Sequence, residues 1–409
     1  MRSLIILKGL VKAEKIRWVK NNKLENYFLD IDTIRKMYCM PELIAPGKEV
    51  LDKSYSGTVY QRFMEALCSR LGKGCLVVID PEQEAGTIIE LLAYIFGYTV
   101  FYVIQNVPKD YIENQSKYRI PYYSMKRKSE LSREVGIFMN TSFKGKIKIK
   151  SYSDVLGYWD HKVKKDKQVV FIKDGDKTLH VGDLHSNIGL YYNLPDFSGY
   201  TKVIFHGDYI DGPKEGGSRA LIDIICNTKN KKIIWLEGNH EIRLRRYLGY
   251  VLLSAGSGRR ELREFIYSTL PDDFLEYTAP EFSDLTPEEA KVYLDVLNNR
   301  FRMFSIIVSP TSKLICTHSG IRLLGQIDPK YIGTAIYGNR EMNRYDKNFS
   351  DLNKNNDIWS IHAHCQYPDS WEIMRYPKVV NLDPRTDSEI VYGEQCRNEW
   401  NFNTIGGSN

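Results

Sequence analysis

The chain has 409 residues, 43% of them hydrophobic and 12% aromatic, which is enough for two packed domains. Its net charge of +6 and pI near 8.7 are compatible with a polyanionic ligand and equally with an ordinary solvated surface. No apolar run reaches the roughly 18 residues of a membrane span, and the seven cysteines form no Cys-x-x-Cys pair. This pattern disfavours a disulfide framework and a cysteine zinc site, so we expect a protein of the reducing cytoplasm.

The chain opens with an apolar run over residues 2–9 that predicts a buried strand, a turn at Gly9 and then a helix. This is the order of a phosphate-binding loop, in which glycines expose N–H groups and a lysine reaches the terminal phosphates. Lys15 keeps the lysine position, but Glu14 replaces the second glycine and Ile16 replaces the metal-binding hydroxyl. On chemistry alone, this loop does not predict a nucleotide site.

Further strands are expected at 75–80 and 98–105, with helices at 59–74 and near 87–96. Over roughly residues 1–140 this order resembles the kinase domain of polynucleotide kinases and implies a P-loop kinase-like domain with a parallel sheet. The residues that the resemblance assigns to a degenerate kinase site are Lys15 in the loop, Asp32 as general base, Arg35 as phosphate contact and Asp80 at a strand end. The changes in the loop predict a pseudokinase that has lost kinase activity. A plain α/β scaffold without a ligand is the alternative.

The segment 141–168 is irregular and rich in lysine, with lysines at alternate positions from Lys144 to Lys150. Alternate residues share one face of a strand. We interpret the segment as a solvated linker or an edge strand, and a ribbon facing a polyanion stays open. The predicted division of the chain is a kinase-like domain at 1–140, a linker at 141–168, a second domain at 169–400 and a disordered tail at 401–409.

Three short apolar runs between Leu179 and Glu241 each end in residue types that bind metals. The pairs are Asp183 with His185, Asp208 with Asp211, and Asn239 with His240. Open α/β sheets place their ligand sites at the carboxyl ends of strands, and two later strand ends supply further imidazoles. These are His318, His362 and His364. Oxygen ligands mixed with imidazoles suit Mn²⁺, Fe, Ni²⁺ or Zn²⁺, so the sequence predicts a site for two ions.

With this set in view, residues 169–395 resemble the calcineurin-like binuclear metallophosphoesterases of the protein-phosphatase-like branch, whose GDxH, GDxxD, GNH[DE] and HxG motifs recur in order. The phosphatase module of bacterial polynucleotide kinase-phosphatases likewise follows a kinase module. The resemblance implies an α/β/β/α sandwich with a helical insertion and two divalent transition metals, Mn²⁺ first and Ni²⁺, Fe or Zn²⁺ as alternatives. It places Asp183, His185 and Asp208 on the first metal and Asp208, Asn239, His318 and His362 on the second.

The role of His364 stays open in this comparison. The leading glycine of the family's GHxH motif is replaced by Ile361, so the register could slide by two residues. His364 could then hold either metal. The family's aspartate after this motif corresponds to Asp383, which we expect near the metals or the substrate.

The resemblance also implies a mechanism in which two cations bind the phosphate and activate a bridging water. His240 is predicted as general acid, with Asp211 fixing its tautomer and raising its pKa. Related phosphatases carry a phosphate-clamping arginine after GDxxD, where this chain has Gly212. The candidate replacements are Arg219, Arg243 and Arg385.

Residues 250–304 are predicted to be a helical insertion, because Thr286 to Glu289 form a capping box with proline at the first helical position. The insertion could overhang the metals or only pack. Residues 343–357 are polar and predict a loop.

The expected function is a metal-dependent phosphoesterase acting on nucleic-acid ends, RNA more than DNA. It would remove a 2′- or 3′-terminal phosphate or open a 2′,3′-cyclic phosphate. The alternatives are a protein serine/threonine phosphatase, a dinucleoside-polyphosphate hydrolase and a non-enzymatic nucleic-acid-binding protein. The sequence leaves open whether the chain forms a homo-oligomer.

Overall fold

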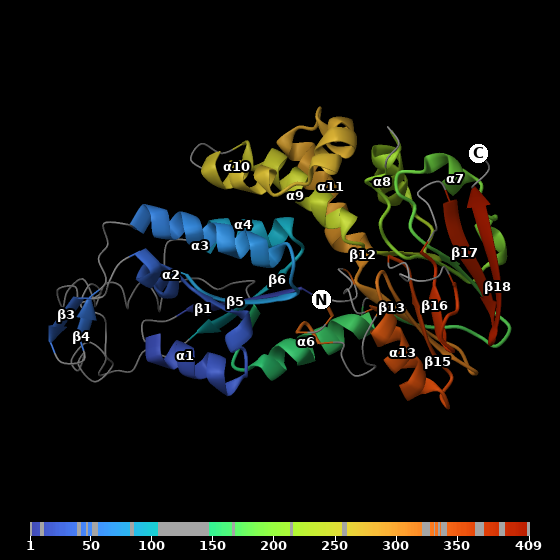
Figure 1. The fold of residues 1–409 in the computed structure, drawn as a ribbon, viewed down its shortest axis with the longest axis horizontal. Helices are drawn as coiled ribbons and strands as arrows, with labels where there is room; N and C mark the ends of the chain where they lie inside the picture. The colour runs from blue at the N-terminus through green and yellow to red at the C-terminus, as the bar shows by residue number, and fades with distance from the viewer. Residues whose placement is uncertain are drawn as a thin grey trace. The chain divides into compact units, whose positions relative to one another are not determined.

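The structure is a computed structural model of the chain (Figure 1). It describes residues 2–8, 12–38, 42–45, 48–50, 56–81, 86–104, 147–165, 168–212, 216–255, 260–320, 328–330, 332–333, 336, 342–364, 372–383 and 389–406. The chain divides into two compact units. Residues 2–94 and 98–159 form the N-terminal unit, and residues 160–409 with 1 and 95–97 form the C-terminal unit.

The N-terminal unit is built on a parallel sheet of strands in the order β2-β5-β1-β6-β7. These strands are β1 (Ser3–Lys8), β2 (Phe28–Asp30), β5 (Leu76–Asp80), β6 (Thr99–Ile104) and β7 (Ile147–Ile149). The helices are α1 (Lys12–Asn21), η1 (Glu25–Tyr27), α2 (Ile31–Tyr38), α3 (Ser56–Leu71), α4 (Gly86–Ile95) and α6 (Tyr152–Lys165), and a small hairpin joins β3 (Glu42–Ala45) to β4 (Lys48–Val50).

Figure 1 shows α3 and α4 along one face of this sheet and α1 and α6 along the other. Helices on both faces explain why β1 is an unbroken apolar run, since its residues from Leu4 to Leu7 are buried on both sides. The predicted parallel sheet is confirmed, and the unit has an α/β architecture. The turn at Gly9 lies outside the described residues.

The predicted linker at 141–168 is wrong for residues 147–165, which belong to the N-terminal unit up to Trp159. Strand β7 pairs in parallel with β6 at the sheet edge, and exposed Lys148 lies between Ile147 and buried Ile149. The buried indole of Trp159 donates to Ser3 Oγ at 2.7 Å. The lysine alternation therefore marks an edge strand, one of the two interpretations that the sequence allowed.

The C-terminal unit contains two packed sheets. The first has the order β12-β11-β10-β9-β17-β18, from β9 (Lys177–Val181), β10 (Lys202–Phe205), β11 (Ile233–Leu236), β12 (Phe301–Arg302), β17 (Glu389–Cys396) and β18 (Glu399–Gly406). The second has the order β16-β15-β14-β13-β8, from β8 (Val169–Phe171), β13 (Phe304–Val308), β14 (Lys313–Thr317), β15 (Ile358–His362) and β16 (Val379–Asn381). One core cluster joins Ile204 and Leu236 of the first sheet to Ile307 and Ile361 of the second, so the sheets pack face to face.

Helices lie beside both sheets of this unit (Figure 1). They are α7 (Ile188–Tyr192), η5 (Phe197–Gly199), α8 (Ser218–Asn227), α9 (His240–Leu253), α10 (Arg260–Ser268), η6 (Phe274–Thr278), η7 (Ala279–Phe282), α11 (Pro287–Arg300) and α13 (Met342–Asn353). Within the described ranges, no helix is long and apolar enough to cross a membrane.

Two polar stretches have regular structure where the sequence predicted none. The expected loop at 343–357 contains α13, which buries Asp346 and Phe349. The expected disordered tail is wrong for residues 401–406, because they form β18 and pair antiparallel with β17. Tertiary partners supply the burial that polar sequences cannot show by themselves. Residues 407–409 lie outside the described part.

The helical insertion between β11 and β12 is confirmed. Thr286 Oγ1 accepts from Glu289 N at 3.2 Å, and the Glu289 carboxylate accepts from Thr286 N at 2.8 Å, which is the predicted capping box. Leu297 is buried, whereas Phe301 lies beyond the helix end and starts β12.

Candidate metal centre

The predicted ligands follow the carboxyl ends of five strands. Asp183 and His185 follow β9, Asp208 follows β10, Asn239 follows β11, His318 follows β14 and His364 follows β15. Three of these strands belong to one sheet and two to the other. The centre therefore joins both sheets at one end of the sandwich.

Asp208 lies at the middle of the centre. Its Oδ2 is 3.3 Å from His318 Nε2 and 3.6 Å from His364 Nδ1. Two groups of candidate metal donors share this carboxylate. They are Asp183, His185 and Asp208, and Asp208, His318 and His364. A carboxylate with two oxygens can serve both groups, so the arrangement suits two neighbouring ions.

Two observations show that cations fit here. Both carboxylate oxygens of Asp183 are buried without a hydrogen-bond partner among the described residues. Burial and the nearby charges of Asp208 and Asp383 raise the pKa of Asp183 well above its ordinary value. An orphaned, desolvated carboxylate beside further anions is costly unless a cation compensates it.

The second observation concerns His318. Its Nδ1 donates to the His206 carbonyl oxygen at 2.7 Å, so in the neutral ring Nε2 carries a lone pair. That lone pair faces Asn239 Oδ1 at 3.0 Å and Asp208 Oδ2 at 3.3 Å. Three electron-rich atoms directed at one point are a suitable donor set for a metal ion.

The backbone supports the same site. His185, Asp208 and His364 have φ values of 43°, 46° and 71°, in the left-handed region that residues other than glycine rarely adopt. Strain of this kind is retained where the surrounding structure fixes a functional side chain.

The structure corrects the ligand assignment of His362. Its Nε2 lies 3.2 Å from Asp346 Oδ2 on α13, and the side chain is fully buried there. It belongs to neither donor group, whereas His364 lies beside Asp208. The physical reason is that His362 ends β15 and His364 lies in the loop beyond it. This is the register shifted by two residues that the sequence left open.

His240 and Asp211 are brought together as predicted, with His240 Nδ1 3.4 Å from Asp211 Oδ2. The expected rise in the pKa of His240 is wrong. Burial lowers that pKa to about 3 and outweighs the opposite effect of Asp208. Asp211 does not reverse this, because Arg243 forms a close ion pair with it and Thr278 Oγ1 donates to its other oxygen at 2.9 Å. Burial therefore favours the neutral imidazole form of His240.

Glu241 is a buried residue of the centre that the sequence analysis missed. Its carboxylate accepts from the backbone N–H groups of Asp208, Tyr209 and Gly238 at 3.1, 2.9 and 2.8 Å. These bonds fasten the loop after β10 to the loop after β11. The sequence signal for this role is Glu241 itself, which is the last residue of the GNHE motif.

Gly212 explains the missing arginine clamp in part. A Cβ built on Gly212 would clash with the His185 carbonyl oxygen, so this conformation accepts no side chain there. Of the proposed replacements, Arg243 contacts Asp211 and also lies 3.2 Å from Asp273. Arg219 is directed instead at Asp284, at 2.6 Å.

Two further candidates remain from the sequence. Asp383 lies close enough to raise the pKa of Asp183 through its charge, as expected of a residue near the metals. Arg385 lies outside the described residues.

In the N-terminal unit, the four predicted kinase-site residues form two ion pairs. Lys15 Nζ lies 2.5 Å from Asp80 Oδ1, with both side chains largely buried, and Arg35 Nη1 lies 3.2 Å from Asp32 Oδ1. Lys15 is thus held on the carboxylate at the end of β5.

Comparison with known families decides the class of the C-terminal unit. A sequence model of the calcineurin-like phosphoesterases matches residues 177–395, more than half of the chain. The chain belongs to this family. It is a metal-dependent hydrolase, and the family's divalent metals fit the orphaned oxygens of Asp183 and the lone pair of His318.

Among solved structures, the chain is similar to a protein provisionally assigned as a diadenosine tetraphosphatase. The two are 16% identical, with a TM-score of 0.35, over 59% of this chain and 98% of the other. A likeness at this level says nothing about the substrate. Comparison with curated proteins found no match.

Proposed function

We propose that the C-terminal unit is a two-metal phosphoesterase that acts on nucleic-acid ends, with RNA as the first candidate. The observation that carries the two-metal proposal is Asp208, which belongs to both donor groups. The reaction would remove a 2′- or 3′-terminal phosphate or open a 2′,3′-cyclic phosphate.

The proposed ligands follow the two donor groups. Asp183, His185 and Asp208 would hold the first ion, and Asp208, Asn239, His318 and His364 would hold the second. Bound divalent ions supply positive charge for the phosphate oxygens and lower the pKa of a water. Mn²⁺ is the first candidate because hard carboxylate and amide oxygens stand beside the imidazoles and no thiolate takes part, and Ni²⁺, Fe and Zn²⁺ are alternatives.

His240 is proposed to hydrogen-bond the oxygen that leaves the phosphate. Its Nε2 lies 3.6 Å from Asp208 Oδ2, so the ring edge is directed at the metal ligands. As a neutral imidazole it would donate an N–H hydrogen bond to the leaving oxygen and keep its proton, and the leaving group would take its proton from solvent. His240→Ala should then slow esters with a poor leaving group far more than an activated aryl phosphate. Equal losses on both substrates would contradict this role.

Arg243 is proposed to replace the arginine clamp on the substrate phosphate. It lies in the first turn of α9, three residues after His240, and its side chain is 22% exposed. The paired carboxylates of Asp211 and Asp273 would orient the guanidinium rather than consume all of its donors, since it offers five N–H groups.

The preference for nucleic-acid ends rests on the N-terminal unit. Its parallel sheet and the order of its elements are those expected of a polynucleotide-kinase-like domain, in which Lys15 pairs with Asp80 and Arg35 with Asp32. With Glu14 in place of a loop glycine, we propose that this unit binds a polynucleotide without phosphorylating it. A dinucleoside-polyphosphate hydrolase or a protein serine/threonine phosphatase fits the family equally well.

The deciding experiment is a substrate panel with Mn²⁺, using the full chain. The panel contains a 2′,3′-cyclic nucleotide, RNA with 2′- or 3′-phosphate ends, diadenosine tetraphosphate and a phosphoserine peptide. The expected result is the highest kcat/KM on the RNA ends or the cyclic phosphate, abolished in Asp208→Asn. Preference for the peptide or the dinucleotide would refute the proposed substrate and leave the hydrolase class intact.

A further inference from the structure

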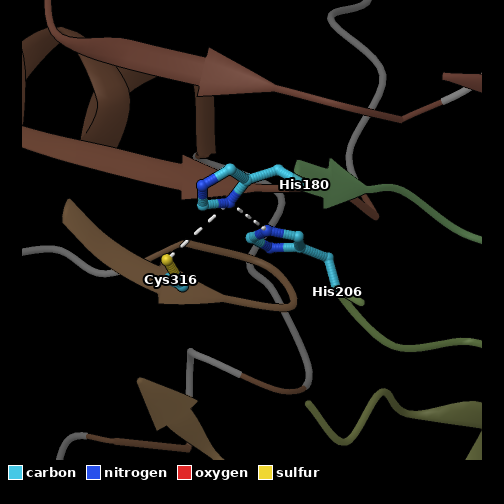
Figure 2. A group of neighbouring side chains, drawn as sticks. All are labelled: His180, His206 and Cys316. Atoms are coloured by element: carbon cyan, nitrogen blue, oxygen red, sulfur yellow. Dashed lines mark hydrogen bonds between the residues drawn. The ribbon is translucent and has the colours of Figure 1, made fainter. Parts of the chain in front are cut away.

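A second cluster of metal-binding side chains lies in the interior of the sandwich and takes no part in the proposed chemistry. His180 comes from β9, His206 directly follows β10 and Cys316 comes from β14, and all three are fully buried. Figure 2 shows the two imidazoles and the thiol directed toward one another. The cluster therefore joins the first sheet to the second.

The donor atoms have the spacing of a metal site. His180 Nδ1 lies 3.2 Å from His206 Nε2 and 3.9 Å from Cys316 Sγ, and all three donors lie within 4.8 Å of one another. An ion bound at normal zinc–nitrogen and zinc–sulfur bond lengths places such donors roughly 3.3–3.8 Å apart. Small side-chain movements would close the coordination.

The hydrogen bonds on the far sides of the two rings indicate which nitrogen of each ring carries the proton. Gln395 donates through Nε2 to the Arg397 carbonyl, so its Oε1 accepts from Thr178 Oγ1 at 2.9 Å. Having used its proton, Thr178 Oγ1 accepts from His180 Nε2 at 3.0 Å. This chain of hydrogen bonds favours a proton on His180 Nε2, which leaves a lone pair on its Nδ1.

His206 is fixed in the same way. Its Nδ1 lies 2.7 Å from the Thr317 carbonyl oxygen, which can only accept, so the ring proton is on Nδ1. The lone pairs of His206 Nε2 and His180 Nδ1 then face each other at 3.2 Å. Metal-bound histidines have this arrangement, with the outer N–H held by an oxygen and the inner nitrogen left bare.

A proton shared between the two rings is the other way to relieve this repulsion. It would leave an imidazolium in the core, where both rings are fully buried. In the described part of the chain, the hydrogen bonds of these three side chains reach no carboxylate. An unpaired buried charge is costly. The thiol of Cys316, by contrast, can supply a compensating anion.

We propose that His180 Nδ1, His206 Nε2 and Cys316 Sγ form a third metal site, separate from the phosphoesterase centre, for a thiophilic ion. On binding, Cys316 releases its thiol proton and the sulfur–metal bond forms. One thiolate and two neutral imidazoles neutralise Cu⁺, whereas Zn²⁺ would leave a net positive charge in the core. The balance of charge and the soft sulfur ligand favour Cu⁺.

The proposed site would also stabilise the position of a ligand of the phosphoesterase centre. The His206 carbonyl accepts from His318 Nδ1 at 2.7 Å, and Cys316 lies two residues before His318 on the same chain segment. An ion holding His206 and Cys316 together would thus fix the position of a proposed catalytic ligand.

The test uses the full chain with Asp183→Asn and Asp208→Asn, which removes carboxylates of the phosphoesterase centre. Protein produced with Cu⁺ or, in a parallel arm, Zn²⁺ is desalted and its metal content measured. Reconstitution with Co²⁺ adds a spectroscopic arm, because only a thiolate ligand gives sulfur-to-cobalt charge-transfer absorption. The expected result is one tightly held equivalent of Cu⁺ and the cobalt–thiolate band. Both should be lost in Cys316→Ser and retained in Cys226→Ser, which changes a free cysteine outside the cluster.

A protein that retains no ion, or a Cys316→Ser variant that retains it, would overturn the site. Retention of Zn²⁺ but not Cu⁺ would support the site and overturn the monovalent assignment. If Cys316→Ser fails to fold, Thr178→Val decides. It leaves all three ligands in place and removes only the acceptor of His180 Nε2, so affinity should fall about 10–100-fold. Unchanged affinity in Thr178→Val would count against the proposal.

Discussion

Two histidines only two residues apart, His362 and His364, have different partners. His364 lies beside the shared carboxylate of Asp208, and His362 is buried against Asp346. His364 is thus a candidate metal ligand and His362 a packing residue, although both are histidines. The reason is their position: His362 ends β15, whereas His364 lies in the loop beyond it with φ 71°.

Replacing each histidine by alanine should separate these roles. His364→Ala should lower kcat by more than the roughly 10–100-fold that loss of a residue behind a metal ligand costs. His362→Ala should lower the free energy of unfolding by about 1–3 kcal/mol, because the buried contact between His362 and Asp346 is lost, while the metal affinity changes less. Steady-state kinetics over a range of Mn²⁺ concentrations and urea unfolding measure the two effects. A larger loss of kcat in His362→Ala than in His364→Ala would instead identify His362 as the metal ligand.

Arg243 is the residue on which phosphate binding should depend. Arg243→Ala should lower kcat/KM about 10–100-fold, the equivalent of one charge-assisted hydrogen bond of roughly 1.5–3 kcal/mol, mainly through KM. Arg243→Lys should recover only part of this, since lysine lacks the planar fork. Arg219→Ala is the matched control, because Arg219 is directed at Asp284. Equal losses in both alanine variants would argue against a clamp at Arg243.

At the scale of elements, the strand ends and the insertion position the centre together. Glu241 in the first turn of α9 ties the loop after β10 to the loop after β11, and Thr278 of the insertion donates to Asp211. The insertion therefore reaches the candidate site through a hydrogen bond to Asp211, a contact that its apolar spacing could not indicate.

The capping box of α11 should contribute to stability independently of the site. Thr286→Ala should lower the free energy of unfolding by about 1 kcal/mol, because the N–H of Glu289 loses its acceptor. Ser268→Ala removes a hydroxyl that donates only to the preceding turn of its own helix and should change stability by less than about 0.5 kcal/mol. Urea unfolding of both variants makes the comparison. An equal loss of stability in the two variants would show that the capping box contributes no more than an ordinary surface hydroxyl.

For the whole molecule, the buried histidines between the sheets predict acid sensitivity. Burial lowers the pKa of His206 to about 3 and that of His180 well below its ordinary value. The unfolded chain therefore takes up protons first, at a pH near 6.5. Stability is full above about pH 6.5 and is lost as the pH falls toward 3, with a slope of up to about 1.4 kcal/mol per pH unit for each imidazole.

Unfolding free energies measured in chelator at pH 7 and pH 5 should show this decline. The His206→Asn variant is less stable at both values but should lose less stability between them. A parallel decline in the variant would mean that other groups cause the acid sensitivity. Asp183 acts in the opposite direction, since its raised pKa favours the protonated, folded form as the pH falls. The difference between wild type and variant isolates the histidine contribution.

The sequence by itself determined the hydrolase family, the parallel sheet of the N-terminal unit and most candidate donors of the metal centre. It could do so because apolar runs mark strands, and the motifs lie at strand ends, where the local chain fixes residue spacing. Asp183, His185, Asp208, Asn239 and His318 lie where those patterns placed them.

Only the tertiary structure decided what depends on contacts between distant segments. It placed His364 rather than His362 beside Asp208, and burial in it lowered the pKa of His240. It also formed α13 and β18 from polar residues. It also brought His180, His206 and Cys316 together from two sheets. No local pattern encodes such convergence, because burial and pairing are set by neighbours that lie more than a hundred residues away in the chain.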